Sequence, residues 1–243
     1  MYRTRYLIVI LLLFSGKSLF AQAPAWGGGA DQQDYSFGFT FQYVNNYFKI
    51  TKKPNWRAPF YDPVEGKNVT DSLNSISSPG SPGFAVGFLA RYRISEHLEA
   101  RTTPSLIFAD RTISYTYITP SQNVDKTVQT TIMDLPLELK LKSDRIQDFR
   151  MYLLGGIKYS MAIASKKNPP DIDPLDALVR NKSGYGSYEL GLGCDIYFEY
   201  FKLSPELKFS NSFGNVLVPE NHPFSEPISK LSLHTVTFSL IFE

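Results

Sequence analysis

Cysteine and histidine are scarce in this chain, and its net charge is small. The 243 residues include one cysteine, Cys194, three histidines, and 25 basic against 23 acidic residues. A single cysteine excludes an internal disulfide. His97, His222 and His234 lie far apart in the sequence, without the spacing of a metal site or a catalytic triad. We therefore expect no enzymatic activity, no metal and no cofactor, and the near-neutral charge gives no reason to expect nucleic-acid binding.

Long hydrophobic runs are also absent, apart from one near the start. Two arginines precede the apolar run Tyr6–Phe14, and the small residue Ala21 follows it. This order is typical of a secretory signal peptide, so we expect cleavage after Ala21. The run has about half of the roughly 20 residues that a spanning helix needs, which disfavours a permanent anchor. Removal of residues 1–21 takes away three basic residues and no acid, leaving 22 basic against 23 acidic residues.

Apolar and polar residues alternate with a period of two in eight later segments, as in strands with one apolar face. We expect a flexible periplasmic lead-in over residues 22–34 and an outer-membrane β-barrel over residues 35–243. The predicted fold is all-β, an eight-stranded antiparallel transmembrane barrel of OmpA or OmpX size. The alternating segments are Tyr35–Tyr43, Phe84–Ile94, Leu98–Phe108, Met133–Leu141, Met151–Met161, Tyr188–Phe198, Phe201–Phe209 and Leu231–Glu243.

The connections between these segments alternate between short and long. Short ones lie near residues 95–97, 143–148 and 199–200, and long ones cover residues 51–82, 119–126, 165–183 and 214–230. Such asymmetry is typical of periplasmic turns and extracellular loops, and it places both termini in the periplasm. A soluble sandwich with solvent-facing charges is the alternative. Prolines inside three strand runs are irregular for either fold, at Pro104, Pro136 and Pro205.

The polar faces of the predicted strands carry many charges, which an eight-stranded barrel would enclose. Eight basic and six acidic residues nearly cancel, and buried charges are costly unless they are paired. We therefore predict a salt-bridged lumen, too full to conduct anything large. The predicted lumen charge network is Arg91, Arg93, Glu99, Arg101, Asp134, Glu138, Lys140, Arg150, Lys158, Glu189, Asp195, Lys202, Glu206 and Lys208.

Two of the long loops contain aromatic and aliphatic residues among prolines. Residues of this kind on loops are candidates for contacts with a partner protein. The alternative is that they pack over the mouth of the barrel, and the sequence does not decide between the two. The candidate partner-contact residues are Trp56, Phe60, Tyr61, Leu217 and Phe224.

The second half of the chain resembles a known family. Met133–Lys140 looks like the D-x-P-x-x-x-K strand of PorT-type barrels, and Tyr188–Ser210 is similar over its whole length. Gly155–Tyr159 and Phe238–Glu243 also fit, so the resemblance to the PorT/SprT family spans roughly residues 131–243. Cys194 stands where a plainer hydrophobe is expected. The resemblance implies an outer-membrane component of the type IX secretion system of Bacteroidetes, needed to export cargo with C-terminal sorting domains.

These observations favour a non-enzymatic secretion subunit with an accessory or assembly role, because a plugged barrel of this size cannot itself conduct folded proteins. Its expected partners are other secretion-system proteins in the outer membrane or periplasm and the lipid bilayer, with no small-molecule substrate. A stand-alone structural or adhesive barrel is the alternative. A lipid-modifying barrel enzyme is a third hypothesis, but it needs a Ser, His and acid cluster near one rim that the sequence does not reveal.

Overall fold

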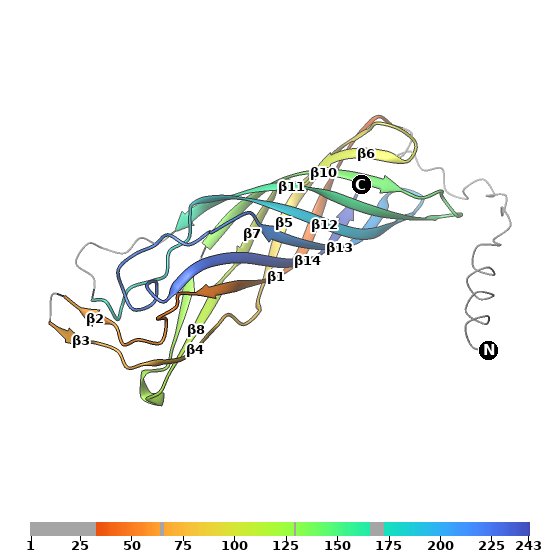
Figure 1. Ribbon diagram of the computed structural model, residues 1–243. Coiled ribbons are helices and arrows are strands. Elements are labelled where there is room, and N and C mark those ends of the chain that lie inside the picture. Colours follow the sequence, from red (N-terminus) through yellow and green to blue (C-terminus); the bar gives the residue numbers. More distant parts are fainter. Residues whose placement is uncertain (1–32, 64–65, 129, 166–172) are drawn as a thin grey trace, which may run out of the picture.

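The computed structural model describes residues 33–63, 66–128, 130–165 and 173–243. Within these ranges a closed antiparallel sheet forms a barrel with eight strand positions in its wall (Figure 1). Two short strands share the third position, and the last strand pairs with the first to close the wall. Around the wall the strands are β1 (Tyr35–Lys52), β5 (Ser81–Arg93), β6 (Leu98–Thr102) with β7 (Ser105–Ala109), β10 (Thr130–Lys142), β11 (Phe149–Ser165), β12 (Gly184–Tyr197), β13 (Lys202–Ser212) and β14 (Ile228–Phe242).

The predicted all-β, eight-stranded barrel is therefore the fold that is observed. Its first strand begins at Tyr35 and its last ends at Phe242. The predicted signal peptide and all but the last two residues of the predicted lead-in lie outside the described residues. Among the described residues, no helix has the length and hydropathy to cross a bilayer.

The two faces of the wall differ in chemistry, because successive side chains on a strand point to opposite sides. Apolar side chains point outward, and Phe37 and Phe88 are each 75% exposed. Polar and charged side chains point inward, where Glu99 and Asp195 have no exposed surface. An apolar exterior around a polar interior reverses the arrangement of a water-soluble barrel and suits a lipid environment.

The two ends of the barrel also differ (Figure 1). Tight turns over residues 94–97, 143–148 and 198–201 lie at one end, together with the start of β1 and the end of β14; we call it the short-turn end. The opposite, long-loop end carries a domain that we call the cap. Its elements are β2 (Tyr61–Asp62), β3 (Lys67–Asn68), β4 (Leu73–Ser77), β8 (Arg111–Tyr117), the 3-10 helix η1 (Pro120–Gln122), β9 (Val124–Val128) and the described loops around them.

The cap has an apolar core of its own. Strand β8 follows β7 after Asp110 and forms the middle of a three-stranded sheet with β4 and β9. Side chains from this sheet pack against others from β1, β14 and the loops before β12 and β14, and together they cover the mouth of the barrel. The buried members are Phe48, Leu73, Ile76, Ile113, Tyr115, Tyr117, Val179, Val216, Leu217, Phe224, Ile228, Leu231 and Leu233.

A smaller apolar layer lies inside the barrel between the charged residues and the cap. It is formed by inward side chains of β1, β5, β7 and β10. On each of these strands the layer lies between the polar and charged inward positions on its short-turn side and the cap on its other side. Its members are Val44, Ala85, Ile107, Ala109 and Ile132.

The three irregular prolines occupy gaps in the hydrogen-bonded ladder. Pro104 separates β6 from β7, and β10 pairs with β6 at residues 138–141 and with β7 at residues 131–134, which leaves Pro136 beside the break. There the Thr102 hydroxyl donates to the Pro136 carbonyl at 2.6 Å. Pro205 lies where the pairing of β12 with β13 is interrupted between Gly193 and Ile196. Since proline has no N–H to donate, these positions tolerate it.

Candidate functional site

The inward face of the wall brings most of the predicted charged residues together. Of the fourteen predicted positions, thirteen have no more than 9% exposed side-chain or residue surface. Arg93 is the exception: its side chain is 36% exposed at the short-turn rim, where it lies 3.5 Å from Asp34. The enclosed charges form three successive layers along the barrel axis.

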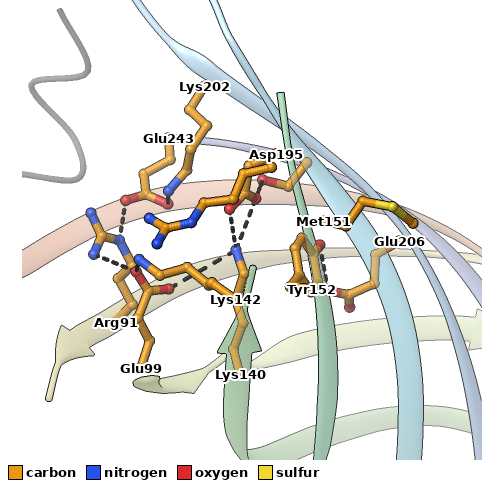
Figure 2. Close-up of polar contacts among 12 residues, drawn as sticks. Arg91, Glu99, Lys140, Lys142, Met151, Tyr152, Asp195, Lys202, Glu206 and Glu243 are labelled. Carbon is orange, nitrogen blue, oxygen red and sulfur yellow. Dashed lines mark hydrogen bonds and ion pairs between the residues drawn. The ribbon is translucent and has the colours of Figure 1, made fainter. Parts of the chain in front are cut away.

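The first layer lies at the short-turn end and is centred on two carboxylates (Figure 2). Glu243 accepts a hydrogen bond from Arg91 and lies 2.8 Å from the Lys202 ammonium. Glu99 lies 3.1 Å from Arg91 and also pairs with Lys142. Arg91 therefore joins the two carboxylates, and the layer links strands β5, β6, β10 and β13 to the end of the chain.

Lys140 extends this layer across the barrel. Its ammonium lies 2.7 and 2.8 Å from the two carboxylate oxygens of Asp195 and 3.9 Å from Glu99. It also lies 3.8 Å from the centroid of the Tyr152 ring, a cation–π distance. Asp195 accepts a further hydrogen bond from the Ser204 hydroxyl at 2.6 Å. These partners offset part of the cost of burying the ammonium.

The second layer surrounds Arg101. Its guanidinium donates to Glu138 at 2.7 Å and also to Glu206, which lies 105 residues away in the sequence. Lys208 pairs with the same two carboxylates at 2.9 and 3.5 Å. The Tyr152 hydroxyl donates to Glu206 at 2.9 Å. Two basic and two acidic groups thus form a four-membered cluster that spans the lumen.

The third layer is smaller and lies closest to the apolar layer. Lys158 is 2.8 Å from Asp134 and 3.8 Å from Glu189. A cavity of about 10 Å³ lies here, between these residues and the neighbouring layer. Its volume is about that of one water molecule.

Sequence reasoning missed two members of the network, Lys142 and Glu243. Both lie at inward positions: Lys142 shares its face with Lys140, and Glu243 continues the alternation of Thr237 and Ser239. That alternation was the signal that could have identified them. Arg150 is also buried, and it donates to backbone carbonyls of the neighbouring turns at residues 96 and 143, at 2.9 and 2.5 Å.

Charge pairs and hydrogen bonds hold the network together. Over the described residues it contains eight basic side chains, counting Arg150 and Lys142, and seven acidic ones, counting Glu243. The first two layers join strands that are distant in the sequence, whereas the third joins the neighbouring strands β10, β11 and β12. The arrangement can stabilise the barrel and close it to solutes.

The histidines lie in three separate places. His97 is 2.9 Å from Asp144 at the short-turn end, His222 is 3.5 Å from Glu220 in the cap, and His234 stacks on Tyr47 with ring centroids 5.3 Å apart. Across the part of the chain that the structure describes, no group of three or more His, Cys, Asp or Glu residues is arranged to hold a metal ion.

The five loop residues proposed as partner contacts do not form one surface. Phe60, Leu217 and Phe224 are buried, with 6%, 2% and 2% exposure, and Trp56 packs partly buried against the cap core. Tyr61, at 57%, is exposed. The partner-contact assignment is therefore wrong for the three buried residues, because their side chains are not accessible to a partner. Leu217 and Phe224 belong to the apolar core of the cap.

Comparison with known proteins identifies the family. The profile of the outer membrane protein beta-barrel domain family matches residues 28–218. The chain belongs to this family. The barrel is therefore an outer-membrane protein, in agreement with its apolar exterior. Among curated proteins, none matches the chain significantly by sequence.

Several solved outer-membrane barrels are similar in structure. OprG of Pseudomonas aeruginosa has 8% identity and a TM-score of 0.47, covering 87% of this chain and 96% of its own. Neisserial surface protein A has 9% identity and a TM-score of 0.41, covering 86% of this chain and 98% of its own. AlkL has 14% identity and a TM-score of 0.41, covering 91% and 93%. At these values the likeness carries no weight for function.

Proposed function

We propose that this chain is a non-enzymatic subunit of the type IX protein secretion system, needed for the export of cargo with C-terminal sorting domains. Its role is accessory or in assembly, and its partners are other secretion proteins in the outer membrane or periplasm. The filled interior of the barrel is the observation that carries the accessory role. The resemblance to PorT-type barrels carries the assignment to this system.

The interior supports an accessory role because nothing of useful size fits through it. Three layers of paired charges lie inside the lumen, the cavity beside Lys158 has room for one water, and the cap covers the far mouth. Removing one partner from such a network would leave a buried charge unpaired, so opening it is costly. Cargo must therefore use a different conduit, and this barrel acts on that conduit or on its assembly.

The stretch that carries the resemblance also supplies a large part of the lumen network. Tyr188–Ser210 covers most of β12 and β13. Its inward charged residues are Glu189, Asp195, Lys202, Glu206 and Lys208. The residues that carry the resemblance are thus among those that fill the lumen, which links the proposed function to a closed barrel.

The proposed orientation places the short-turn end in the periplasm and the cap outside the cell. Outer-membrane barrels typically have short periplasmic turns and longer extracellular loops. Both termini then lie in the periplasm, where β1 begins and β14 ends. Of the predicted loop contacts, exposed Tyr61 remains as a candidate for a partner on the outer surface.

A pull-down from outer membranes in mild detergent tests this proposal. A tagged full-length chain should bring down a larger barrel and secretion lipoproteins, identified by mass spectrometry, and its deletion should abolish cargo export. The purified protein should show no ion conductance in planar bilayers. Normal export after deletion would overturn the secretion role and favour the stand-alone structural or adhesive barrel. Cargo passage across vesicles that contain this barrel alone would overturn the accessory role.

A further inference from the structure

Three exposed lysines lie on the outer side of the wall at the long-loop end. Lys49 belongs to β1, Lys230 belongs to β14, and Lys182 lies two residues before β12. Among the described residues, none of the three ammonium groups has a hydrogen bond or an ion pair. We call these residues the lysine row. They differ in this respect from the lysines of the lumen, which are buried and paired with carboxylates.

Strand pairing brings two of these lysines close together. Strands β1 and β14 lie side by side (Figure 1), with Lys49 opposite Ser232 and Lys230 opposite Thr51. Lys49 and Lys230 are therefore diagonal neighbours on the same face of the sheet. Residues in this relation lie about 7–8 Å apart, which is within reach of long side chains. Two like charges at this spacing repel each other, so an anion between them is favourable.

Backbone hydrogen bonds place the third lysine beside this pair. The N–H of Lys182 donates to the Val216 carbonyl at 2.8 Å, and the N–H of Val216 donates to the Leu231 carbonyl at 2.9 Å. Leu231 directly follows Lys230 on β14. Because neighbouring strands lie about 4.8 Å apart, the backbone of Lys182 is about 10 Å from that of Leu231. The row thus extends along one side of the rim, from β1 across β14 to the segment before β12.

The position of the row along the barrel identifies its surroundings. Exposed aromatic side chains dominate the outward face of β1 from Phe37 to Tyr47. At about 3.3 Å per residue and a tilt of about 40°, this stretch rises about 25 Å, the height of the apolar band of an outer-membrane barrel. The Tyr47 ring stacks on His234, as in the aromatic girdle that ends such a band. Lys49 is the next outward residue, so the row lies at the level of the lipid headgroups.

The sector of the wall around the row carries basic charge alone. The segments that surround the three lysines, residues 45–51, 182–188, 209–216 and 229–236, contain no aspartate or glutamate. Glu220, in the loop before β14, is paired with Arg180 at 2.6 Å. On the other side of the wall, β7 leads instead to the exposed acid Asp110. The lysines therefore face the membrane surface without a counter-charge from their own sector.

We propose that the lysine row binds the phosphate groups of lipids in the leaflet at the cap end of the barrel. In the proposed orientation these lipids are the phosphorylated glycolipids of the outer leaflet. Lysine binds phosphate as a compact point charge, and basic residues beside membrane-embedded surface attract anionic headgroups. The acyl chains of the same lipid pack on the apolar band directly below. This inference rests on the outer-membrane location of the barrel and does not depend on the secretion role.

Two matched glycolipids test the proposal: diphosphoryl lipid A and monophosphoryl lipid A with the same acyl chains, which differ by one phosphate. The full chain is held in a neutral detergent and titrated with each lipid, and native mass spectrometry counts the lipids bound to each protein. The diphosphoryl form should bind more tightly than the monophosphoryl form, and both more tightly than phosphatidylcholine, which has no net charge. Raising the salt concentration should weaken the binding, because salt screens exposed charges.

Paired substitutions separate the row from general attraction to a lipid surface. Lys49→Gln combined with Lys230→Gln should weaken binding of diphosphoryl lipid A about 25-fold, about fivefold for each lysine, and leave phosphatidylcholine unchanged. Lys49→Arg combined with Lys230→Arg keeps both charges and should retain the binding. The control, Arg57→Gln combined with Lys67→Gln, removes two exposed charges from the cap and should change little. Heat-modifiability on a gel checks that each variant remains folded.

Three results would overturn the proposal. One is equal binding of diphosphoryl lipid A by the wild type and by the variant with both glutamines at 49 and 230. The second is an equal loss in the cap control, which would show that net charge alone attracts the lipid. The third is displacement of the lipid by inorganic phosphate at the concentration of the lipid itself, which would show that the row binds the free anion and not a headgroup.

Discussion

Arg101 offers the sharpest test of the idea that paired charges form the core of this barrel. Its side chain is 2% exposed and joins Glu138 on β10 to Glu206 on β13. Replacement by methionine keeps much of the volume but removes the charge. The two carboxylates then share Lys208 alone, at 2.9 and 3.5 Å. Breaking a buried ion pair from one side costs about 3–5 kcal/mol, so Arg101→Met should lower the free energy of unfolding by about that amount.

The assay is equilibrium unfolding in urea with the protein refolded into lipid vesicles, followed by the loss of heat-modifiability on a gel. The matched control is Arg93→Met, the same substitution at the rim, where the side chain is 36% exposed and faces Asp34 at 3.5 Å. An exposed pair contributes about 0–1 kcal/mol, so the control should lie close to the wild type. Both substitutions remove the same charge, so the difference between their losses of unfolding free energy reports the effect of burial.

A second substitution decides whether the cost arises from stranded charge. In the Arg101→Met, Glu206→Gln double variant, the remaining Glu138 and Lys208 form a balanced pair. The double variant should recover at least half of the loss, a coupling that independent sites would not show. The idea of an ionic core is refuted if Arg101→Met unfolds at the same urea concentration as Arg93→Met. It is also refuted if the double variant loses the sum of the unfolding free energies that its two single variants lose.

Three further predictions address the lumen and the cap. Gly193→Ala should destabilise the barrel by about 1–3 kcal/mol, because its new methyl would lie 2.5 Å from the Tyr152 hydroxyl, whereas Gly155→Ala meets no atom closer than 3.2 Å and should be mild in the same urea assay. Lys158→Met should also lower the urea midpoint, since it strands two buried carboxylates; an unchanged midpoint would argue against pairing there. Burial lowers the pKa of His222 below its usual 6.5, so cap stability should be complete above pH 6.5 and fall as the pH drops further. Hydrogen exchange in the cap at pH 7.5 and 5 measures this, and equal protection at both would contradict it.

Much of the wall could be predicted from the sequence because its signal is local. Alternation with a period of two identifies a strand and assigns each residue to a face, as it did for Glu189 and Lys208 on β12 and β13. The pairing of basic with acidic side chains cannot be predicted from local sequence, because it depends on the register of the strands in the wall and on side chains that cross the lumen. Arg101 and Glu206 come from strands that do not pair with each other.

The cap could not be predicted for a different reason. Leu217 and Phe224 lie in a loop with no periodic pattern, so nothing in their spacing distinguishes a buried residue from an exposed one. Their burial depends on the distant strand β8, whose Tyr115 packs against Phe224 across 109 residues. The reason why proline fits within these strands could not be predicted either, because Pro136 lies beside the break that Pro104 makes in the neighbouring strand position.

The barrel is stabilised by paired charges in its interior and the cap by an apolar core, and the membrane explains this difference. A barrel in lipid gains nothing from placing its apolar side chains inward, because the bilayer already surrounds them. Its interior is free to hold charges, and in the described lumen these become specific links among strands. The cap stands in water and needs a conventional apolar core. A substitution such as Arg101→Met should therefore destabilise the barrel, and a substitution such as Ile113→Ala should destabilise the cap. The barrel and the cap should then unfold under different perturbations.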